Sequence, residues 1–379
     1  MAENFTLNPV EGGLFVGRKE IMREMLAELT NPESHAGFCL LGRRRMGKTS
    51  IFRELESELS GRKGVVFAYL SLADLADVSV KTFAEQLSMA VLEASRKKGI
   101  LPLEYSMDAL MKSPREVIQS SLSKVKLTDQ ISDELSFFFE SGKGKNEDDV
   151  EAVHRAFDLG DKLAKAHGSK FVLVLDEFPE ILKLDDGEQM VKMFRTIHDK
   201  QRNTALIISG SEKKTLEQVA LSPESPFYKQ LIFVELQPFS FEETVQFLKK
   251  YGLVLSDADA RKLYYVSGGM PYYLQYFGRS GKLTQDIDAA IANFIKEEGG
   301  VFFSEELGKL SKKEKVIVRA IAAGESSPTG IAEKSGEPVT SVSSYLVSLQ
   351  RKEIVEKARK AEYVLSDRLF ALWMQERYR

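Results

Sequence analysis

Eight consecutive residues near the N-terminus have the types and spacing of a loop that binds phosphate groups. The segment Gly42-Arg43-Arg44-Arg45-Met46-Gly47-Lys48-Thr49 fits the pattern G-x-x-x-x-G-K-[ST] at every fixed position. In this pattern the backbone N–H groups turn inward around the phosphates, and the glycines allow a turn that a Cβ atom would block. Lys48 can reach the β and γ phosphate oxygens, and the Thr49 hydroxyl can bind Mg²⁺.

The residues on either side of this loop favour the same interpretation. An apolar run at 37–41 predicts a buried strand, and the apolar residues of 50–59 recur at helical spacing, which predicts a helix that begins near Ser50. A helix that starts directly after the loop points the positive end of its dipole at the bound anion. The sequence therefore predicts a nucleotide site that includes Gly42 to Ser50, with Lys48 acting in catalysis as well as in binding.

A pair of carboxylates follows the most apolar strand of the chain. The run Lys170-Phe171-Val172-Leu173-Val174-Leu175 leads into Asp176-Glu177. Asp176 is expected to hold Mg²⁺, directly or through water, and Glu177 to polarise the water that attacks the γ-phosphate. The polar end of the next strand offers a residue that senses this phosphate, with Ser211 as the first choice and Ser209 as the second.

Composition limits the class of protein and of partner. The chain has 379 residues, of which 43% are hydrophobic and 29% charged, and its formal net charge is −3. These values argue against disorder and against a chain that coats nucleic acid along its whole length, so any DNA binding is expected to be local. The single cysteine, Cys39, excludes a disulfide framework. With no apolar stretch that would cross a bilayer, we expect a soluble cytoplasmic protein without a membrane partner.

Five short apolar runs alternate with helical segments over the first two thirds of the chain. The expected strands lie at 37–41, 64–70, 170–175, 204–211 and 231–236, and none alternates strictly between polar and apolar residues. This pattern predicts an α/β fold with a parallel sheet covered by helices on both faces. A mostly helical stretch is expected over 81–149, ending in an exposed loop at 141–149, but its role is open. Ligands of such folds bind outside the carboxyl ends of the strands.

Several motifs together resemble a known group of nucleotide-binding proteins. They are FVGR at 15–18, GRRRMGKTS at 42–50, VLVLDEFPEI at 172–181, GGMPYYL at 268–274 and YVLSDRLFALW at 363–373. In combination they resemble the archaeal-type P-loop ATPases of the STAND branch of the AAA+ superfamily, which are related to the Orc/Cdc6 initiators. The resemblance implies a P-loop NTPase domain, a helical lid and a C-terminal winged helix, with ATP or ADP bound between the first two. The corresponding boundaries are 1–237, 238–300 and 301–379.

The resemblance adds candidate residues around the adenine. Phe15 and Val16 precede Gly17-Arg18 and could pack on the ring, although a simple lead into the next helix is the alternative. Pro271 and Tyr272 follow two glycines in what looks like the lid element near the adenine, or alternatively form a turn without a ligand. One departure concerns the stretch before the fifth strand, where related proteins carry an arginine and this chain has Lys229. This leaves the oligomeric state, and hydrolysis that depends on it, open.

The C-terminal segment predicts three helices and a hairpin with a basic tip. The helices are expected at 314–323, 328–335 and 338–352, and the hairpin pairs 354–357 with 363–365 around residues 358–361. This order is typical of a winged helix. The candidate DNA-binding residues are Ser341, Ser344, Arg351, Lys352, Arg359 and Lys360. Hydroxyl groups on a recognition helix and cations on a wing suit phosphate contacts, but winged helices also bind proteins, so both partners stay open.

These observations favour an ATPase whose nucleotide state positions a winged helix on double-stranded DNA or on a protein. The alternative is a regulator or scaffold that is stabilised by bound ADP and hydrolyses ATP slowly, with the winged helix used for protein docking. The two hypotheses share the same nucleotide site and differ in the rate of turnover.

Overall fold

The computed structural model describes residues 5–75, 79–100, 149–211, 213–280 and 286–378. Contacts divide the chain into two units, which we call the sheet unit (Pro9–Gln237) and the helical unit (Pro238–Arg379 with the N-terminal segment that ends at Asn8). The chain therefore crosses between the units twice, and a proline follows each crossing. Because proline fixes φ, each crossing has a restricted backbone.

The sheet unit contains the five-stranded parallel sheet that the sequence predicts. Its strands are β1 (Gly37–Leu41), β2 (Val65–Ser71), β3 (Lys170–Asp176), β4 (Thr204–Gly210) and β5 (Leu231–Glu235). They are hydrogen-bonded in the order β2-β3-β4-β1-β5. The order places β4 between β3 and β1, so the carboxyl ends of these three strands are neighbours. No periodicity in the sequence indicated this order.

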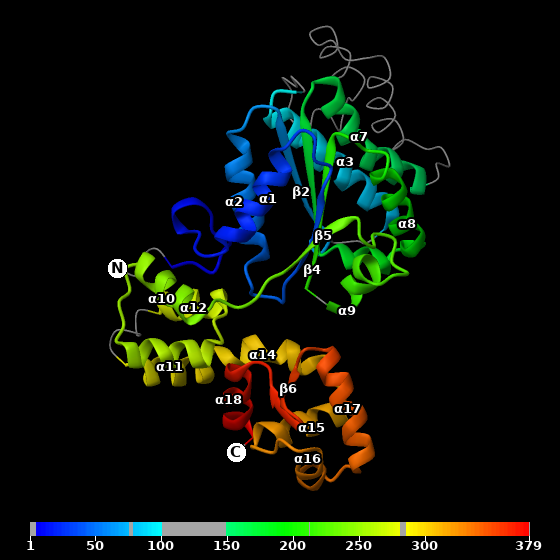
Figure 1. The fold of residues 1–379 in the computed structure, drawn as a ribbon. Helices are drawn as coiled ribbons and strands as arrows, with labels where there is room; N and C mark the ends of the chain where they lie inside the picture. Colours follow the sequence, from blue (N-terminus) through cyan, green and yellow to red (C-terminus); the bar gives the residue numbers. More distant parts are fainter. Residues whose placement is uncertain (1–4, 76–78, 101–148, 212, 281–285, 379) are drawn as a thin grey trace. The chain divides into compact units, whose positions relative to one another are not determined.

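Helices flank this sheet, with α1 and α2 on one side and α3, α7 and α8 on the other (Figure 1). Their bounds are α1 Lys19–Thr30, α2 Lys48–Ser60, α3 Val80–Lys97, α7 Asp149–Ala166 and α8 Gly187–His198. Shorter helical turns are Gly12–Leu14, Phe178–Lys183, α9 Lys213–Leu216 and Glu217–Leu221. The predicted helical stretch 81–149 is observed as α3 and the start of α7, and its part at 101–148 lies outside the described residues.

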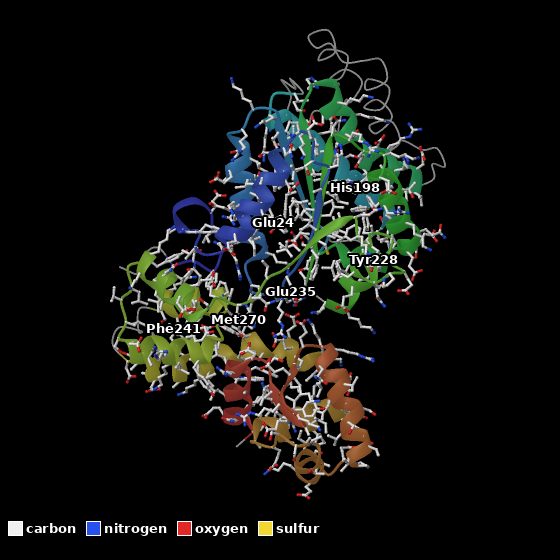
Figure 2. The ribbon with its side chains drawn as sticks, viewed as in Figure 1. Glu24, His198, Tyr228, Glu235, Phe241 and Met270 are labelled. Atoms are coloured by element: carbon white, nitrogen blue, oxygen red, sulfur yellow. The ribbon has the colours of Figure 1, made fainter. Side chains whose placement is uncertain are left out.

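Buried side chains fill the space between the sheet and its helices (Figure 2). Phe194 of α8 lies at the centre of an aromatic group, with its ring edge-on to those of Phe83, Phe157 and Phe178. Cys39 of β1 is fully buried, and burial raises the pKa of its thiol to about 12. That thiol is therefore a small apolar core group at neutral pH.

The helical unit begins with helices that have well-defined starts. These are α10 (Phe241–Lys250), α11 (Asp257–Ser267), α12 (Pro271–Arg279), α13 (Ile287–Asn293), the π-helical turn Phe294–Glu298 and α14 (Gly299–Gly308). Ser240 and Glu243 form a capping box at the start of α10, and Ser256 caps α11. None of the helices in the described ranges combines the length and apolarity needed to cross a bilayer.

The N-terminal segment packs within the helical unit, which the sequence did not indicate. The ring of Phe5 stacks on that of Tyr251, the residue after α10, at 4.7 Å between centroids, and the Thr6 backbone N–H donates to Oε1 of Gln275 at 3.0 Å. A Cβ atom on Gly278 would overlap the Phe5 ring, so a glycine is needed there for the close approach. The chain thus leaves the helical unit at Asn8 and returns to it at Pro238.

The C-terminal elements follow the order that the sequence predicts. They are α15 (Lys312–Ala322), α16 (Pro328–Ser335), α17 (Val339–Arg351), the antiparallel pair β6 (Val355–Arg359) and β7 (Glu362–Leu365), and α18 (Arg368–Arg377). The hairpin tip is tighter than expected, because Ala358 and Arg359 belong to β6 and Ala361 takes a left-handed backbone (φ 60°). The final helix α18 was not predicted.

The expected lid and winged helix pack together in one unit. The Tyr273 hydroxyl of α12 donates to the Asp367 carboxylate, which also caps α18 by accepting from Phe370 N–H. The Arg368 guanidinium lies 3.8 Å from the centroid of the Tyr265 ring and donates to its carbonyl at 2.7 Å. Side-chain contacts thus join residues on both sides of position 300. The boundary between the expected lid and the expected winged helix stays a prediction.

Glu314 of α15 is buried and accepts hydrogen bonds from several directions. Its carboxylate accepts from Lys352 Nζ, Ser348 Oγ and Ser311 N, each at 2.8 Å. Burial alone would raise the pKa of Glu314, but the hydrogen bonds from Lys352, Ser311 and Ser348 outweigh it and lower the pKa to about 2. Glu314 thus joins the start of α15 to the end of α17.

We expect Glu314→Gln to lower the free energy of unfolding of the helical unit at pH 7 by about 2 kcal/mol, the scale of a charged hydrogen bond. Because the folded pKa lies below the ordinary value, this contribution is present above about pH 4.5 and is lost as the pH falls towards about 2. Urea unfolding followed by fluorescence of Trp373, the single tryptophan, reports on this unit. An equal loss of stability at pH 7 and pH 2 would contradict the assignment.

Candidate active site

The phosphate-loop residues connect the carboxyl end of β1 to the first turn of α2. Gly47 has φ 88° and is the N-cap of α2, so Lys48 and Thr49 are the first two residues of the helix. Gly42 is buried at the other end, where its N–H donates to the carbonyl of Gly210 in β4 at 3.2 Å. The loop is therefore fixed to the sheet at one end and to a helix N-terminus at the other, which is the arrangement that binds an anion.

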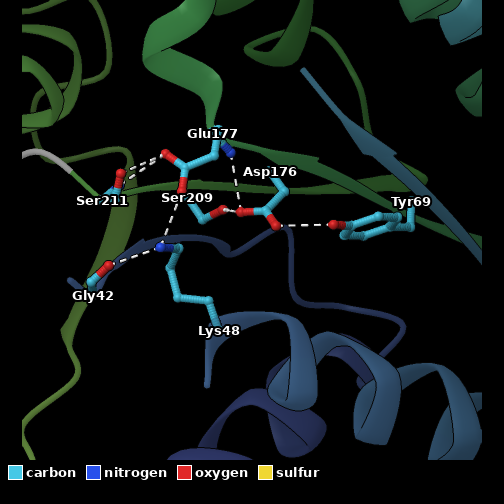
Figure 3. Close-up of polar contacts among 7 residues, drawn as sticks. All are labelled: Gly42, Lys48, Tyr69, Asp176, Glu177, Ser209 and Ser211. Carbon is cyan, nitrogen blue, oxygen red and sulfur yellow. Dashed lines mark hydrogen bonds and ion pairs between the residues drawn. The ribbon is translucent and has the colours of Figure 1, made fainter. Parts of the chain in front are cut away.

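Lys48 is paired with Glu177 across the end of the sheet (Figure 3). Its Nζ lies 3.1 Å from Glu177 Oε1 and donates to the Gly42 carbonyl at 2.8 Å. The Lys48 side chain is 8% exposed and that of Glu177 is 24% exposed. Residues more than 120 positions apart in the chain are thus brought together by the order of the strands.

Glu177 is held in place by the end of the neighbouring strand. Its Oε2 accepts from Ser211 N at 3.0 Å and from Ser211 Oγ at 2.9 Å. The backbone of Glu177 is left-handed, with φ 51°, which costs a non-glycine residue about 1 kcal/mol or more. A strained backbone and two donors fix this carboxylate beside the phosphate loop, where a general base would have to lie.

Asp176 lies beside Glu177 and accepts hydrogen bonds from the two neighbouring strands and from the backbone of Glu177 (Figure 3). Its Oδ2 accepts from the Tyr69 hydroxyl of β2 at 2.9 Å, and its Oδ1 accepts from Ser209 Oγ of β4 and from Glu177 N at 3.0 Å. The side chain is nearly inaccessible. Burial, the charge of Asp176 and its hydrogen bond raise the pKa of Tyr69, so that the hydroxyl stays protonated and remains a donor.

The oxygen groups at this position fit Mg²⁺. This ion prefers carboxylate, hydroxyl and phosphate oxygens and usually binds to one or two protein ligands together with the phosphates of a nucleotide. Asp176 and Thr49 offer a carboxylate and a hydroxyl. Within the described ranges, no group of three or more His, Cys, Asp or Glu side chains could hold a metal ion by itself. These oxygen groups are compatible with a Mg²⁺ site that the phosphates of a nucleotide would complete.

The predicted adenine residues before α1 are linked to the phosphate loop. Arg18 has a left-handed backbone (φ 59°) at the N-cap of α1, and its Nη2 lies 3.5 Å from the carbonyl of Met46. Phe15, Val16 and Gly17 precede it and are partly buried. Arg18 thus contacts the loop, while the contact of the segment 15–18 with an adenine ring stays a prediction.

The remaining loop residues differ in exposure. Met46 is buried, Arg43 and Arg45 are partly buried, and Arg44 is exposed. Ser50 Oγ accepts a hydrogen bond from Val10 N at 3.2 Å, which ties the start of the sheet unit to α2. The Ser50 hydroxyl therefore has a structural partner in Val10, and its role in nucleotide binding stays a prediction.

The other predicted site residues lie in the helical unit. Pro271 is the first residue of α12, and Tyr272 follows it with its ring 5.4 Å from that of Phe302. Their roles at the nucleotide stay predictions. Lys229 lies in the sheet unit with a left-handed backbone (φ 58°), and its Nζ lies 5.3 Å from the centroid of the Tyr228 ring.

The candidate DNA-binding residues fall on α17 and on the hairpin. Ser344, Arg351, Arg359 and Lys360 are exposed, and Ser341 is partly buried. Lys352 forms the ion pair with Glu314, so its ammonium already has a partner within the protein. The Ser344 hydroxyl donates to the carbonyl of Thr340 at 3.3 Å. The exposed cations among these candidates therefore lie on the hairpin and at the end of α17.

Together, the parallel sheet, the loop at a helix N-terminus and the paired carboxylates define a P-loop nucleotide-binding protein. The chain belongs to the family of ATPase domains found predominantly in Archaea, whose sequence pattern matches residues 15–277. This family assignment identifies the protein as an ATPase.

Two solved structures share this fold. A Walker-type ATPase of Pyrococcus abyssi is similar, with a TM-score of 0.68 and 20% identity over 98% of this chain and 99% of that one. The Aeropyrum pernix ORC2 protein, solved with ADPNP and ADP, gives a TM-score of 0.54 and 15% identity over 95% and 93% of the chains. The predicted resemblance to initiator-type P-loop ATPases is thereby confirmed for the fold, while the STAND branch stays a prediction.

A protein of Methanocaldococcus jannaschii with no described function is 23% identical over 222 residues, or 54% of this chain. The matching region spans about half of that relative, 48% of its length.

Sequence reasoning identified the loop and both carboxylates but missed Tyr69. A hydroxyl-bearing aromatic residue near the end of a predicted strand was visible in the sequence, yet its partner depended on which strands are neighbours. In the structure Tyr69 is opposite Val174 in the β2–β3 register, and Ser71 is opposite Asp176. The strand order therefore decides that Tyr69 belongs to the site.

We expect Lys48→Ala to remove most of the thermal stabilisation that ATP gives to the protein, because the variant loses the cation that binds phosphate. A ligand at 100 times its Kd stabilises the folded state by about 2.7 kcal/mol. Melting curves with and without ATP measure this effect. Lys63→Ala is the matched control, since Lys63 is exposed after α2. An unchanged ATP shift in Lys48→Ala would place the nucleotide elsewhere.

Proposed function

We propose that this ATPase hydrolyses ATP between Lys48 and Glu177 and that its nucleotide state controls how the helical unit engages a partner. The observation that supports this most is the ion pair between Glu177 and Lys48, the residue at the C-terminal end of the phosphate loop, with 3.1 Å between Nζ and Oε1. A phosphate group that binds Lys48 competes with Glu177 for the same ammonium. Nucleotide binding would thereby free a carboxylate that Ser211 holds beside the phosphates.

In the proposed reaction, Glu177 accepts a proton from the attacking water, and Lys48 stabilises the charge on the phosphate oxygens. Ser211 orients Glu177 through its N–H and its hydroxyl. Thr49 and Asp176 would hold Mg²⁺, which supplies positive charge to the β and γ phosphates when bound. Phe15 to Arg18 are the proposed neighbours of the adenine.

We expect Glu177→Gln to reduce phosphate release at least about 100-fold, because the amide cannot accept the proton. ATP binding should be retained, since the amide also pairs less strongly with Lys48. Phosphate release and ATP affinity are measured separately on the same variant. Glu180→Gln is the control, because Glu180 lies on the helical turn that follows Glu177 and pairs with Lys183 instead. Phosphate release that equals the wild-type rate would refute the role of Glu177.

The second candidate is a nucleotide-stabilised regulator with little turnover. It is favoured by the lysine at position 229, whose single charge cannot replace the planar fork of an arginine at the γ-phosphate of a neighbouring subunit. In this case the wild-type protein would retain ADP through purification and release almost no phosphate, while ADP would still raise its melting temperature. Rapid turnover of the wild type would exclude this candidate.

The C-terminal elements from α15 to β7 are proposed to form a winged helix. The order of three helices and a hairpin supports this, and the exposed Arg359 and Lys360 at the hairpin tip suit contacts with DNA phosphates. The outer face of α17 instead presents neutral groups such as Val339, Ser343 and Val347. Arg351 is the first arginine of α17, so the rest of this face has no guanidinium that could form two hydrogen bonds to a guanine. The face therefore does not favour base-specific contacts. We favour DNA bound through its phosphates, with protein docking as the alternative.

Binding to double-stranded DNA should weaken steeply with salt, because phosphate contacts release counterions. The double variant Arg359→Ala/Lys360→Ala should reduce the slope of log K against log salt by about 2. Fluorescence anisotropy with a labelled duplex measures the slope. Lys296→Ala is the control cation, since it lies in the helical unit outside α17 and the hairpin. Wild-type binding that does not depend on salt, or no binding, would favour a protein partner.

A further inference from the structure

The carboxylate of Asp176 has an uneven set of donors. Oδ1 accepts two hydrogen bonds, from Ser209 Oγ and Glu177 N, whereas Oδ2 accepts one, from the Tyr69 hydroxyl. Each carboxylate oxygen has two lone pairs. Among the described residues, two donors therefore use both lone pairs of Oδ1. One donor uses one lone pair of Oδ2, which leaves the other lone pair for a further partner.

Tyr69 contacts the helix of the phosphate loop as well as Asp176. It lies on β2, the strand next to β3 in the sheet, and its ring is 5.9 Å from that of Phe52 in α2. Phe52 is 1% exposed, and α2 is the helix that begins with Lys48 and Thr49. The Tyr69 ring therefore links the helix of the phosphate loop to the carboxylate of β3.

We propose that Tyr69 is a positioning residue that fixes Asp176 so that Oδ2 is the oxygen presented to Mg²⁺ or to a water bound to Mg²⁺. This rests on the proposed role of Asp176 in the metal site. Without the Tyr69 hydroxyl, only the donors on Oδ1 hold the carboxylate, and it can rotate about its Cβ–Cγ bond. Loss of a group that orients a metal ligand commonly weakens metal binding by about 10- to 100-fold. We expect an effect of this order when the Tyr69 hydroxyl is removed.

The test measures binding and not turnover. The affinity for a fluorescent, non-hydrolysable ATP analogue is determined in excess EDTA and then over a titration with MgCl₂. In the wild type, Mg²⁺ should increase the affinity. Tyr69→Phe should keep the affinity measured in EDTA, which also shows that the variant is folded, while the Mg²⁺ concentration for half of the effect should rise about tenfold.

A double-variant cycle separates positioning from a general effect on the fold. If Tyr69 acts through Asp176, Tyr69→Phe should have no further effect on the Mg²⁺ dependence in an Asp176→Ala background. Ser209→Ala removes a donor from the other oxygen and should shift the Mg²⁺ dependence in the same direction. Tyr251→Phe is the matched control, because it removes a tyrosine hydroxyl that accepts from Gln275 in the helical unit.

The outcomes distinguish this inference from the proposed function. A wild-type affinity that does not respond to Mg²⁺ would overturn the metal role of Asp176, and the role of Tyr69 with it. A Mg²⁺ response that is the same in the wild type and in Tyr69→Phe would overturn the role of Tyr69 alone. An additive effect of Tyr69→Phe in the Asp176→Ala background would show that Tyr69 does not act through this carboxylate.

Discussion

One lysine ammonium connects the two halves of the candidate site. Lys48 contacts the carboxylate of Glu177 and the carbonyl of Gly42, so it joins the end of β3 to the start of the phosphate loop. A buried cation needs such partners, because its desolvation is costly. In the proposed function a phosphate group replaces Glu177 as that partner, and this exchange would link nucleotide binding to the freedom of the proposed base.

The order of the strands makes this arrangement possible. Because β4 lies between β1 and β3, the serines at its end contact both carboxylates, Ser209 at Asp176 and Ser211 at Glu177. On the other side of β3, β2 supplies Tyr69. The two carboxylates are therefore positioned by side chains from both neighbouring strands, which is why a single substitution in one strand is expected to disturb a particular oxygen and not the whole site.

The helical unit is joined to the sheet unit by two segments of chain. After the first crossing at Asn8, Val10 N donates to Ser50 Oγ and Gly12 N donates to Glu54 Oε2 at 2.5 Å. Both acceptors belong to α2, whose first turn carries Lys48 and Thr49. The helix that would bind phosphate is thus also the helix to which the first residues of the sheet unit are hydrogen-bonded.

The sequence by itself determined the five strands, the phosphate loop and the Asp176–Glu177 pair, because these depend on local spacing and on apolar runs. It also predicted Ser209 and Ser211 at the end of β4. Only the tertiary structure decided the strand order, the contact of Tyr69 with Asp176, the packing of Phe5 in the helical unit and the ion pair that occupies Lys352. Each of these joins residues far apart in the chain, and periodicity within one segment carries no information about such partners.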